Sequence, residues 1–155
     1  MDMLEIGTGT MTIYEEQTHF SFWAALKSPL IIGADITKIS NSSLNILLNK
    51  EIISISQDDA GIAASYIPEL STEGSLQIWA GPLSEGKFVI MALNESKNAT
   101  SIAIPLNRIP NLENPEGKYK IRDIWEAKDL GSSGRSIILP NIGSHQTKVL
   151  VISSA

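Results

Sequence analysis

The sequence lacks cysteine, any excess of basic residues and any long apolar run. Without cysteine the chain forms neither disulfide bonds nor thiolate metal sites. A formal net charge of -5 provides no basic surface for a phosphate backbone, so we expect no nucleic-acid partner. No apolar run approaches the roughly 18–20 residues of a membrane-spanning helix, so we expect no membrane span. The spacing of the acidic residues and the two histidines predicts no metal site.

The composition that remains is that of a folded chain with two parts. Of the 155 residues, 43% are hydrophobic and 19% are charged, which is typical of a globular protein. The length fits one ordinary domain, or part of a domain followed by a small second unit. A change of hydrophobic periodicity near the middle of the chain favours the second arrangement.

Residues 1–58 have the pattern of an α/β segment. Thr12 and Glu15 stand at capping-box spacing, which predicts a helix that runs to about Lys27. The unbroken apolar run 30–32 then predicts a strand that is covered on both faces, as in a parallel sheet.

A second helical region follows that strand. Ser40 is an N-cap residue ahead of leucines at helical spacing, and Asn49 ends the pattern. Residues 50–56 predict one or two further helical turns. The alternation of strand and helix is typical of a parallel α/β fold.

From about residue 61 the sequence has the pattern of short strands separated by turns. No helix-period segment intervenes, so we expect an antiparallel β-sandwich. The predicted boundary lies near residues 57–61, and we assign 59–155 to the sandwich. The runs expected as strands are 76–80, 87–93, 101–106, 118–125, 135–139 and 147–152.

Four segments resemble motifs of one enzyme family. The chain starts M-D-M-L-E-I-G, similar to the family's D-P-D-M-L-x-[VI]-G, and residues 49–58, N-K-E-I-I-S-I-S-Q-D, are similar to its N-K-E-V-I-A-I-N-Q-D. Residues 76–83 resemble L-x-V-W-x-x-P-L, and residues 121–126 resemble V-R-D-L-W. The chain therefore resembles glycoside hydrolase family 27, the α-galactosidases. The resemblance implies that 1–58 are the terminal strand–helix units of a (β/α)8 TIM barrel, followed by the antiparallel β domain.

The resemblance also implies a function for a longer parent protein. That parent would hydrolyse terminal non-reducing α-D-galactose residues of oligosaccharides or glycoconjugates with retention, and without a cofactor. Its two catalytic aspartates would lie upstream of this chain, so we expect no catalytic residue here and no turnover by the chain alone. Galactose, N-acetylgalactosamine and arabinopyranose stay open as the sugar, and so does a homo-oligomeric state of the parent.

Two residues at the start of the chain are the candidates for sugar binding. By the resemblance, Asp2 matches an aspartate that accepts a hydrogen bond from a galactose hydroxyl. Met3 matches a methionine that forms an apolar wall of the same pocket. A carboxylate and a thioether suit the hydroxyls and the CH face of a sugar, respectively.

The other polar candidates have simpler interpretations. Asp35 follows a strand, and we expect it to accept backbone N–H groups or to cap a helix. His19 lies on an apolar helix and predicts a packing role, whereas His145 lies in a turn and predicts exposure. The acidic pair 58–59 is interpreted as part of a linker.

The alternative function is a non-catalytic carbohydrate-binding or interaction module formed by the β half. Such a module would need Trp79 and Trp125 to be exposed together as a stacking surface. Large aromatic residues on strands more often fill a sandwich core, and we expect both there.

Three N-glycosylation sequons point to a secretory route. They begin at Asn41, Asn94 and Asn98. The resemblance likewise implies a secreted, vacuolar or lysosomal parent. The N-terminus of the chain lacks the pattern of a signal peptide, so we expect the signal in the missing front of the parent.

The two halves are expected to differ in stability. A few units taken from a closed barrel would leave apolar faces uncovered, including those of Phe20, Trp23, Leu30 and Ile32. Exposing several hundred Å² at ~25 cal/mol per Å² costs several kcal/mol. We therefore expect residues 1–58 to be loosely held or aggregation-prone, and the β half to fold alone.

Overall fold

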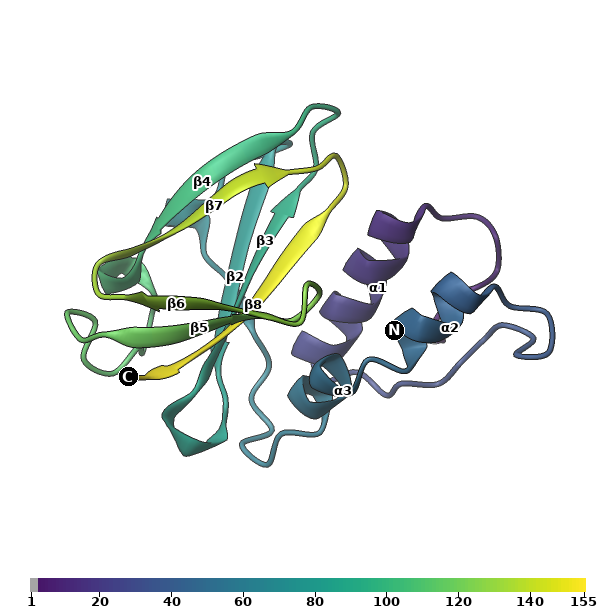
Figure 1. Ribbon diagram of the computed structural model, residues 1–155, viewed down its shortest axis with the longest axis horizontal. Coiled ribbons are helices and arrows are strands. Elements are labelled where there is room, and N and C mark those ends of the chain that lie inside the picture. Colours follow the sequence, from purple (N-terminus) through teal and green to yellow (C-terminus); the bar gives the residue numbers. More distant parts are fainter. Residues whose placement is uncertain (1–2) are drawn as a thin grey trace.

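The computed structural model describes residues 3–155 and divides into a helical region and an all-β region (Figure 1). The helices are α1 (Ile13–Ala25), α2 (Asn41–Leu47) and α3 (Lys50–Ser56). The strands are β1 (Ser65–Tyr66), β2 (Leu76–Pro82), β3 (Phe88–Asn94), β4 (Thr100–Pro105), β5 (Tyr119–Asp123), β6 (Lys128–Ser133), β7 (Ser136–Ile142) and β8 (Thr147–Ser154). Single 3-10 turns occur at Pro68–Leu70, Ser84–Gly86 and Leu106–Arg108.

The three predicted helices are confirmed, and each begins at a side-chain cap. The Thr12 hydroxyl accepts from the Glu15 N–H, while the Glu15 carboxylate accepts from the Thr12 N–H, which completes the capping box. Ser40 caps α2, and the Asn49 side chain accepts from the first turn of α3.

The strands form two antiparallel sheets. The larger has the order β1-β2-β3-β8-β5-β6 and the smaller pairs β4 with β7. The smaller sheet covers one face of the larger, and the helices lie against the opposite face (Figure 1). The predicted β-sandwich is therefore confirmed.

Two strands were missed by the sequence pattern. β1 has only two residues, and β6 lies between the predicted runs 118–125 and 135–139. Nearly every residue of β6 is exposed, so its sequence has no alternation of apolar and polar residues. Pairing with β5 holds it in the sheet.

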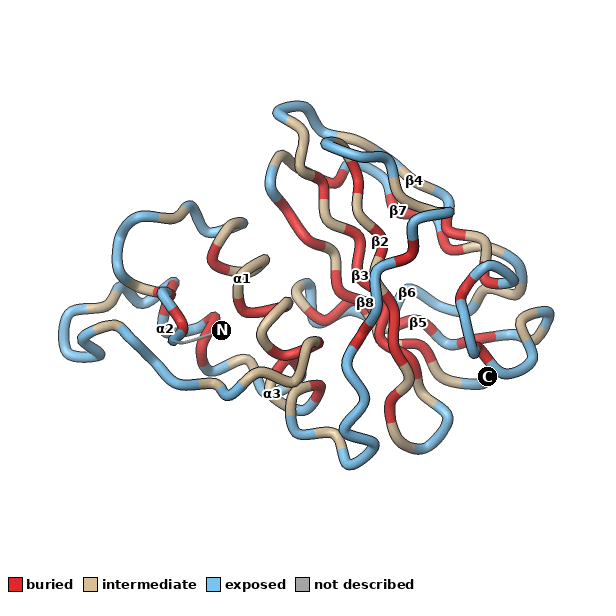
Figure 2. Tube along the Cα trace, turned by 180° about the vertical axis from the view of Figure 1, so that it is seen from behind, coloured by how far each residue is buried: buried red, intermediate tan, exposed pale blue. Residues whose placement is uncertain are grey.

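The centre of the larger sheet is buried on both faces, and β3 shows this along its length. Phe88, Ile90 and Ala92 point into what we call the sandwich core, between the two sheets. Val89 and Met91 point into the interface core, between the sheet and the helices. Successive residues of a strand face opposite sides, so β3 contributes to both cores at once. Buried segments occur both on the central strands and on the helices (Figure 2).

The interface core corrects part of the stability expectation. Phe20 is only 1% exposed and packs with residues of the sheet, so its face is covered within this chain. Ile32 does stay 44% exposed. The predicted parallel pairing of residues 30–32 is present as a single bridge, Leu4 to Ile32, within residues 3–155. This chain alone does not cover both faces there, since Ile31 is also exposed. The boundary between residues 58 and 59 stays a prediction.

Candidate functional site

The strand end at Met3, a sugar-binding candidate, lies beside the strand end at residues 31–33. The Leu4 N–H donates to the Ile31 carbonyl at 2.7 Å, and the Gly33 N–H donates to the Leu4 carbonyl at 2.9 Å. A Cβ at position 33 would lie 3.0 Å from the Leu4 carbonyl oxygen and 3.2 Å from the Met3 Cβ. Glycine therefore permits the close approach of the two segments. With α1 between them, they form the strand–helix–strand unit of a parallel α/β fold.

A cavity of about 380 Å³ opens beside this bridge. Its walls come from the strand end and the following loop: Met3, Leu4, Glu5, Thr8, Thr10 and Gly33. Met3 is 47% exposed and is part of that wall. Asp2 lies outside the described residues, and the sugar-binding role of both residues stays a prediction.

A buried carboxylate holds the loop that lines this cavity. Glu16 of α1 is 3% exposed, and its Oε1 accepts from the Gly7 N–H at 2.8 Å and from the Ser43 hydroxyl at 3.1 Å. Gly7 has φ +85°, which favours glycine. From the sequence, Glu16 is an acidic residue in the first turn of a helix, where it suits the positive end of the helix dipole. That pattern does not predict its contacts with Gly7 and Ser43.

His19 reinforces the same strand end as a packing residue. Its Nε2 accepts from the Glu5 N–H at 3.2 Å, and its ring lies 4.1 Å from the Trp23 ring. Burial lowers the pKa of His19, and the Glu5 carboxylate opposes that shift. These contacts support the predicted packing role, because an Nε2 that accepts a hydrogen bond belongs to the neutral ring.

The remaining polar candidates have structural partners. Asp35 accepts from the N–H and hydroxyl of Thr37 and pairs with Lys38, as expected for a turn carboxylate. His145 is half exposed and lies 3.4 Å from Glu15. Asp58 corrects the linker interpretation, because it accepts from the Ser84 N–H at 2.9 Å and from the Ser84 hydroxyl, and so ties the end of α3 to the β region.

The structure brings together no metal-binding cluster in its described part. Across residues 3–155, no group of three or more histidine or acidic side chains has the geometry to hold a metal ion. Nor does any helix in that range have the length and apolar character to span a membrane.

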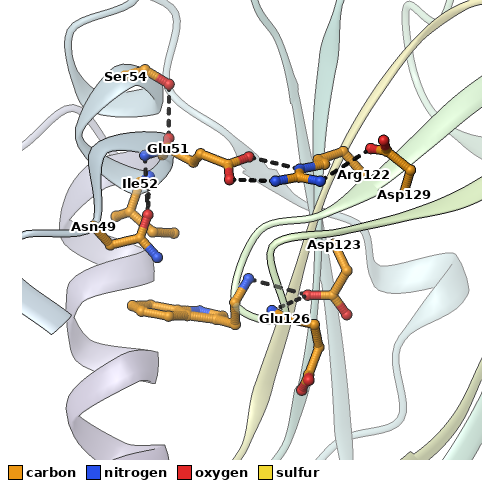
Figure 3. A network of polar contacts seen from close by, with 9 residues as sticks. Asn49, Glu51, Ile52, Ser54, Arg122, Asp123, Glu126 and Asp129 are labelled. Atoms are coloured by element: carbon orange, nitrogen blue, oxygen red, sulfur yellow. Dashed lines mark hydrogen bonds and ion pairs between the residues drawn. The ribbon is translucent and has the colours of Figure 1, made fainter. Parts of the chain in front are cut away.

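Charged side chains connect α3 to the sheet (Figure 3). Arg122 on β5 donates from Nη2 to Glu51 Oε1 at 2.8 Å and from Nε to Glu51 Oε2 at 3.0 Å. Its Nη1 also donates to Asp129 on β6 at 3.2 Å. The hydrogen bonds to Glu51 raise the pKa of Arg122 further above its normal high value. Because both nitrogens of one guanidinium edge are engaged, the contact fixes orientation as well as charge.

Both tryptophans correct the sequence expectation. Trp79 and Trp125 pack against the interface core instead of filling the sandwich core. The Trp125 indole N–H donates to the Ser21 hydroxyl of α1 at 3.0 Å, and the Trp79 ring meets the Phe22 ring edge-on at 5.3 Å. The two rings therefore join the sheet to α1, and this use of them does not favour the sugar-stacking alternative.

Two family models match the chain, in the order that the fold displays. The model described as "Alpha galactosidase A" matches residues 1–58. The model described as "Alpha galactosidase C-terminal beta sandwich domain" matches residues 73–152.

Curated relatives align with nearly the whole chain. The α-galactosidase of Lachancea cidri is 38% identical, over 93% of this chain and 33% of the relative. Alpha-galactosidase 3 of Arabidopsis thaliana is 34% identical, over 98% of this chain and 34% of the relative. The chain thus spans about a third of the length of these relatives.

Solved structures agree with this alignment. α-Galactosidase I from Mortierella vinacea superposes with a TM-score of 0.89 at 33% identity, covering 99% of this chain and 39% of that one. The Saccharomyces cerevisiae α-galactosidase with raffinose gives 0.88 at 25% identity, covering 99% and 46%. A β-L-arabinopyranosidase from Geobacillus stearothermophilus, at 23% identity and a TM-score of 0.84 over 99% and 36% of the two chains, shares the fold.

Proposed function

Because the chain belongs to the α-galactosidases of glycoside hydrolase family 27, we propose that it serves as the C-terminal part of a retaining α-galactosidase. In that enzyme it would supply the last strand–helix unit of the barrel and the β domain that supports it. The observation that carries the proposal is the Leu4–Ile32 bridge, with α1 between its strands, in the segment that the family model matches. The substrate would be a terminal α-linked galactose, and no cofactor is assigned.

The chain's own contribution to the reaction would be substrate binding and support. Retaining hydrolysis needs two carboxyl groups about 5–5.5 Å apart, one as nucleophile and one as acid/base. The proposal assigns neither to this chain. Asp2 would accept hydrogen bonds from a sugar hydroxyl, and Met3 would present its thioether to the sugar. Glu16 would hold the Gly7 loop at the rim of the pocket.

The β domain would act as a buttress. The sheet packs against Phe20 on the inner face of α1, and Arg122 of β5 binds Glu51 of α3. Both contacts would hold the strand–helix unit in place. The contacts of Trp79 and Trp125 support this role over a separate carbohydrate-binding role. The resemblance implies a secreted or vacuolar enzyme, so we propose that the parent protein enters the secretory pathway.

A chimera tests the proposal. The part of the Lachancea cidri relative that precedes the matched segment is joined to this chain, and nitrophenol release from nitrophenyl α-galactoside is measured. We expect the chimera to hydrolyse the α- but not the β-galactoside, and the chain alone to release no nitrophenol above the blank. Asp2→Asn in the chimera should raise KM and lower kcat/KM. Turnover by the chain alone, or a folded chimera without α-galactosidase activity, would contradict the proposal.

A further inference from the structure

Two of the three sequons lie in one turn but in opposite environments. The turn joins β3 to β4 at the upper end of the sandwich in Figure 1. Asn94 ends β3 and is 0% exposed, whereas Asn98 is exposed. Asn94 and Asn98 are both the first residue of an N-x-Ser/Thr sequon, so the folded environment is what distinguishes them.

The side chain of Asn94 is fully engaged inside the protein. The two hydrogens of its Nδ2 are shared among the carbonyls of Asn98 at 2.8 Å, Ile142 at 3.0 Å and Gly143 at 3.0 Å. Its Oδ1 accepts from the N–H of Ser96 at 3.0 Å and from the Ser96 hydroxyl at 2.7 Å. Asn94 therefore ties the β3–β4 turn to the β7–β8 turn.

A glycan at Asn94 is incompatible with these contacts. An N-linked sugar replaces one N–H of Nδ2, so at least one of the donated hydrogen bonds would be lost. The sugar would also have to occupy a site with no solvent exposure. Loss of the bond to the buried Ile142 carbonyl would also weaken the link between the two turns.

Asn98 meets the opposite conditions. Its backbone carbonyl accepts from Asn94 Nδ2 and from the Ser96 hydroxyl at 2.8 Å each, which fixes the turn. Its side chain makes no hydrogen bond to any residue from 3 to 155, and the residue is exposed. We propose that Asn98 is the N-glycan acceptor of this turn, and that Asn94 is a structural residue that stays unmodified in the folded protein.

Secretory expression of the full chain tests this assignment. The chain receives a signal peptide and Asn41→Gln, which removes the third sequon, and is secreted from yeast. The protease-resistant fraction is treated with peptide N-glycosidase, which converts each glycosylated asparagine to aspartate, and is analysed by peptide mass spectrometry. We expect conversion at Asn98 and none at Asn94. Thr100→Val should abolish the modification, whereas Thr100→Ser and Ser96→Ala should retain it.

The absence of cysteine provides a second measurement that does not depend on secretion. Asn98→Cys in the purified chain should react fully with a bulky maleimide under native conditions and leave Tm unchanged. Asn94→Cys should lower Tm and react only after denaturation. Modification at Asn94 in the protease-resistant fraction, an unmodified Asn98 there, or protection of Asn98→Cys from the reagent would overturn the proposal.

Discussion

The two hydrophobic cores differ in where their residues come from. The sandwich core is formed entirely by residues of the β region, from Ile67 to Ile152. The interface core combines helical residues such as Phe20 and Ile52 with sheet residues such as Met91. The helices therefore depend on the sheet for burial, whereas the sandwich core does not depend on the helices. This asymmetry is the reason to expect that the β region folds without the helices.

Core truncation is the strongest test of this asymmetry. Phe20→Ala and Ile104→Ala each remove a fully buried side chain. We expect the free energy of unfolding to fall by about 3–5 and 2–5 kcal/mol, respectively. Phe20→Ala should release the helices while the amides of β4 and β7 keep their hydrogen-exchange protection. Ile104→Ala should lower protection in both regions, because the interface core needs an intact sheet.

Equal loss of β4 and β7 protection in the two variants would break the comparison. It would mean that the chain unfolds as one cooperative unit. Val151→Ala, at a half-buried position on the interface side of β8, is a matched control that should cause a smaller change than either.

The sequence predicted most of the fold because its local signals agree with its tertiary contacts. Thr12, Ser40 and Asn49 each mark a helix start, and alternation marks strands such as β5, where Tyr119 and Ile121 are buried and Lys120 is exposed. The exposed strand β6 could not be predicted, because pairing with β5 and not its own side chains places it.

The interface was harder to predict than either core. The sequence pattern predicts both tryptophans on strands, but Trp125 lies in the turn after β5. For Trp79, sequence alternation does not say which of two buried faces the residue occupies. The hydrogen bonds between Asp58 and Ser84 could not be predicted either, because they join residues 26 positions apart in the sequence. The match to family motifs located the strand end at Met3. The hydrogen bond between Ser43 and Glu16 is visible only once the helices are packed together.

The ion pair between the two regions should make a smaller contribution than either core. Arg122 and Glu51 are partly exposed, so solvent screens their attraction. We expect Arg122→Lys to lower Tm slightly, because lysine cannot reproduce the two parallel hydrogen bonds. A double-mutant cycle with Glu51→Gln, measured at low and high salt, should show coupling that weakens with salt. Asp129→Asn is the control, since it removes only the more exposed partner. Coupling that is absent at low salt would show that the Arg122–Glu51 contact does not stabilise the packing of α3 on the sheet.

The smallest expected effect is a pH dependence confined to the helical region. Burial lowers the pKa of His19, so the unfolded chain, with a histidine pKa of about 6.5, binds the proton more readily than the folded chain. The stability that the neutral ring provides is therefore complete above pH ~6.5 and is lost as the pH falls through the lower folded-state value. Protonation removes the Nε2 lone pair that accepts from the Glu5 N–H, so fraying should begin at the Leu4–Glu5 strand end. Thermal unfolding followed by the helical circular dichroism signal should show a Tm that falls on acidification, and His19→Gln should flatten that dependence. His145→Gln serves as the control, because the side chain of that half-exposed residue pairs with Glu15 and not with the Glu5 N–H. An unchanged slope in His19→Gln would show that the interface core holds the strand end without the histidine.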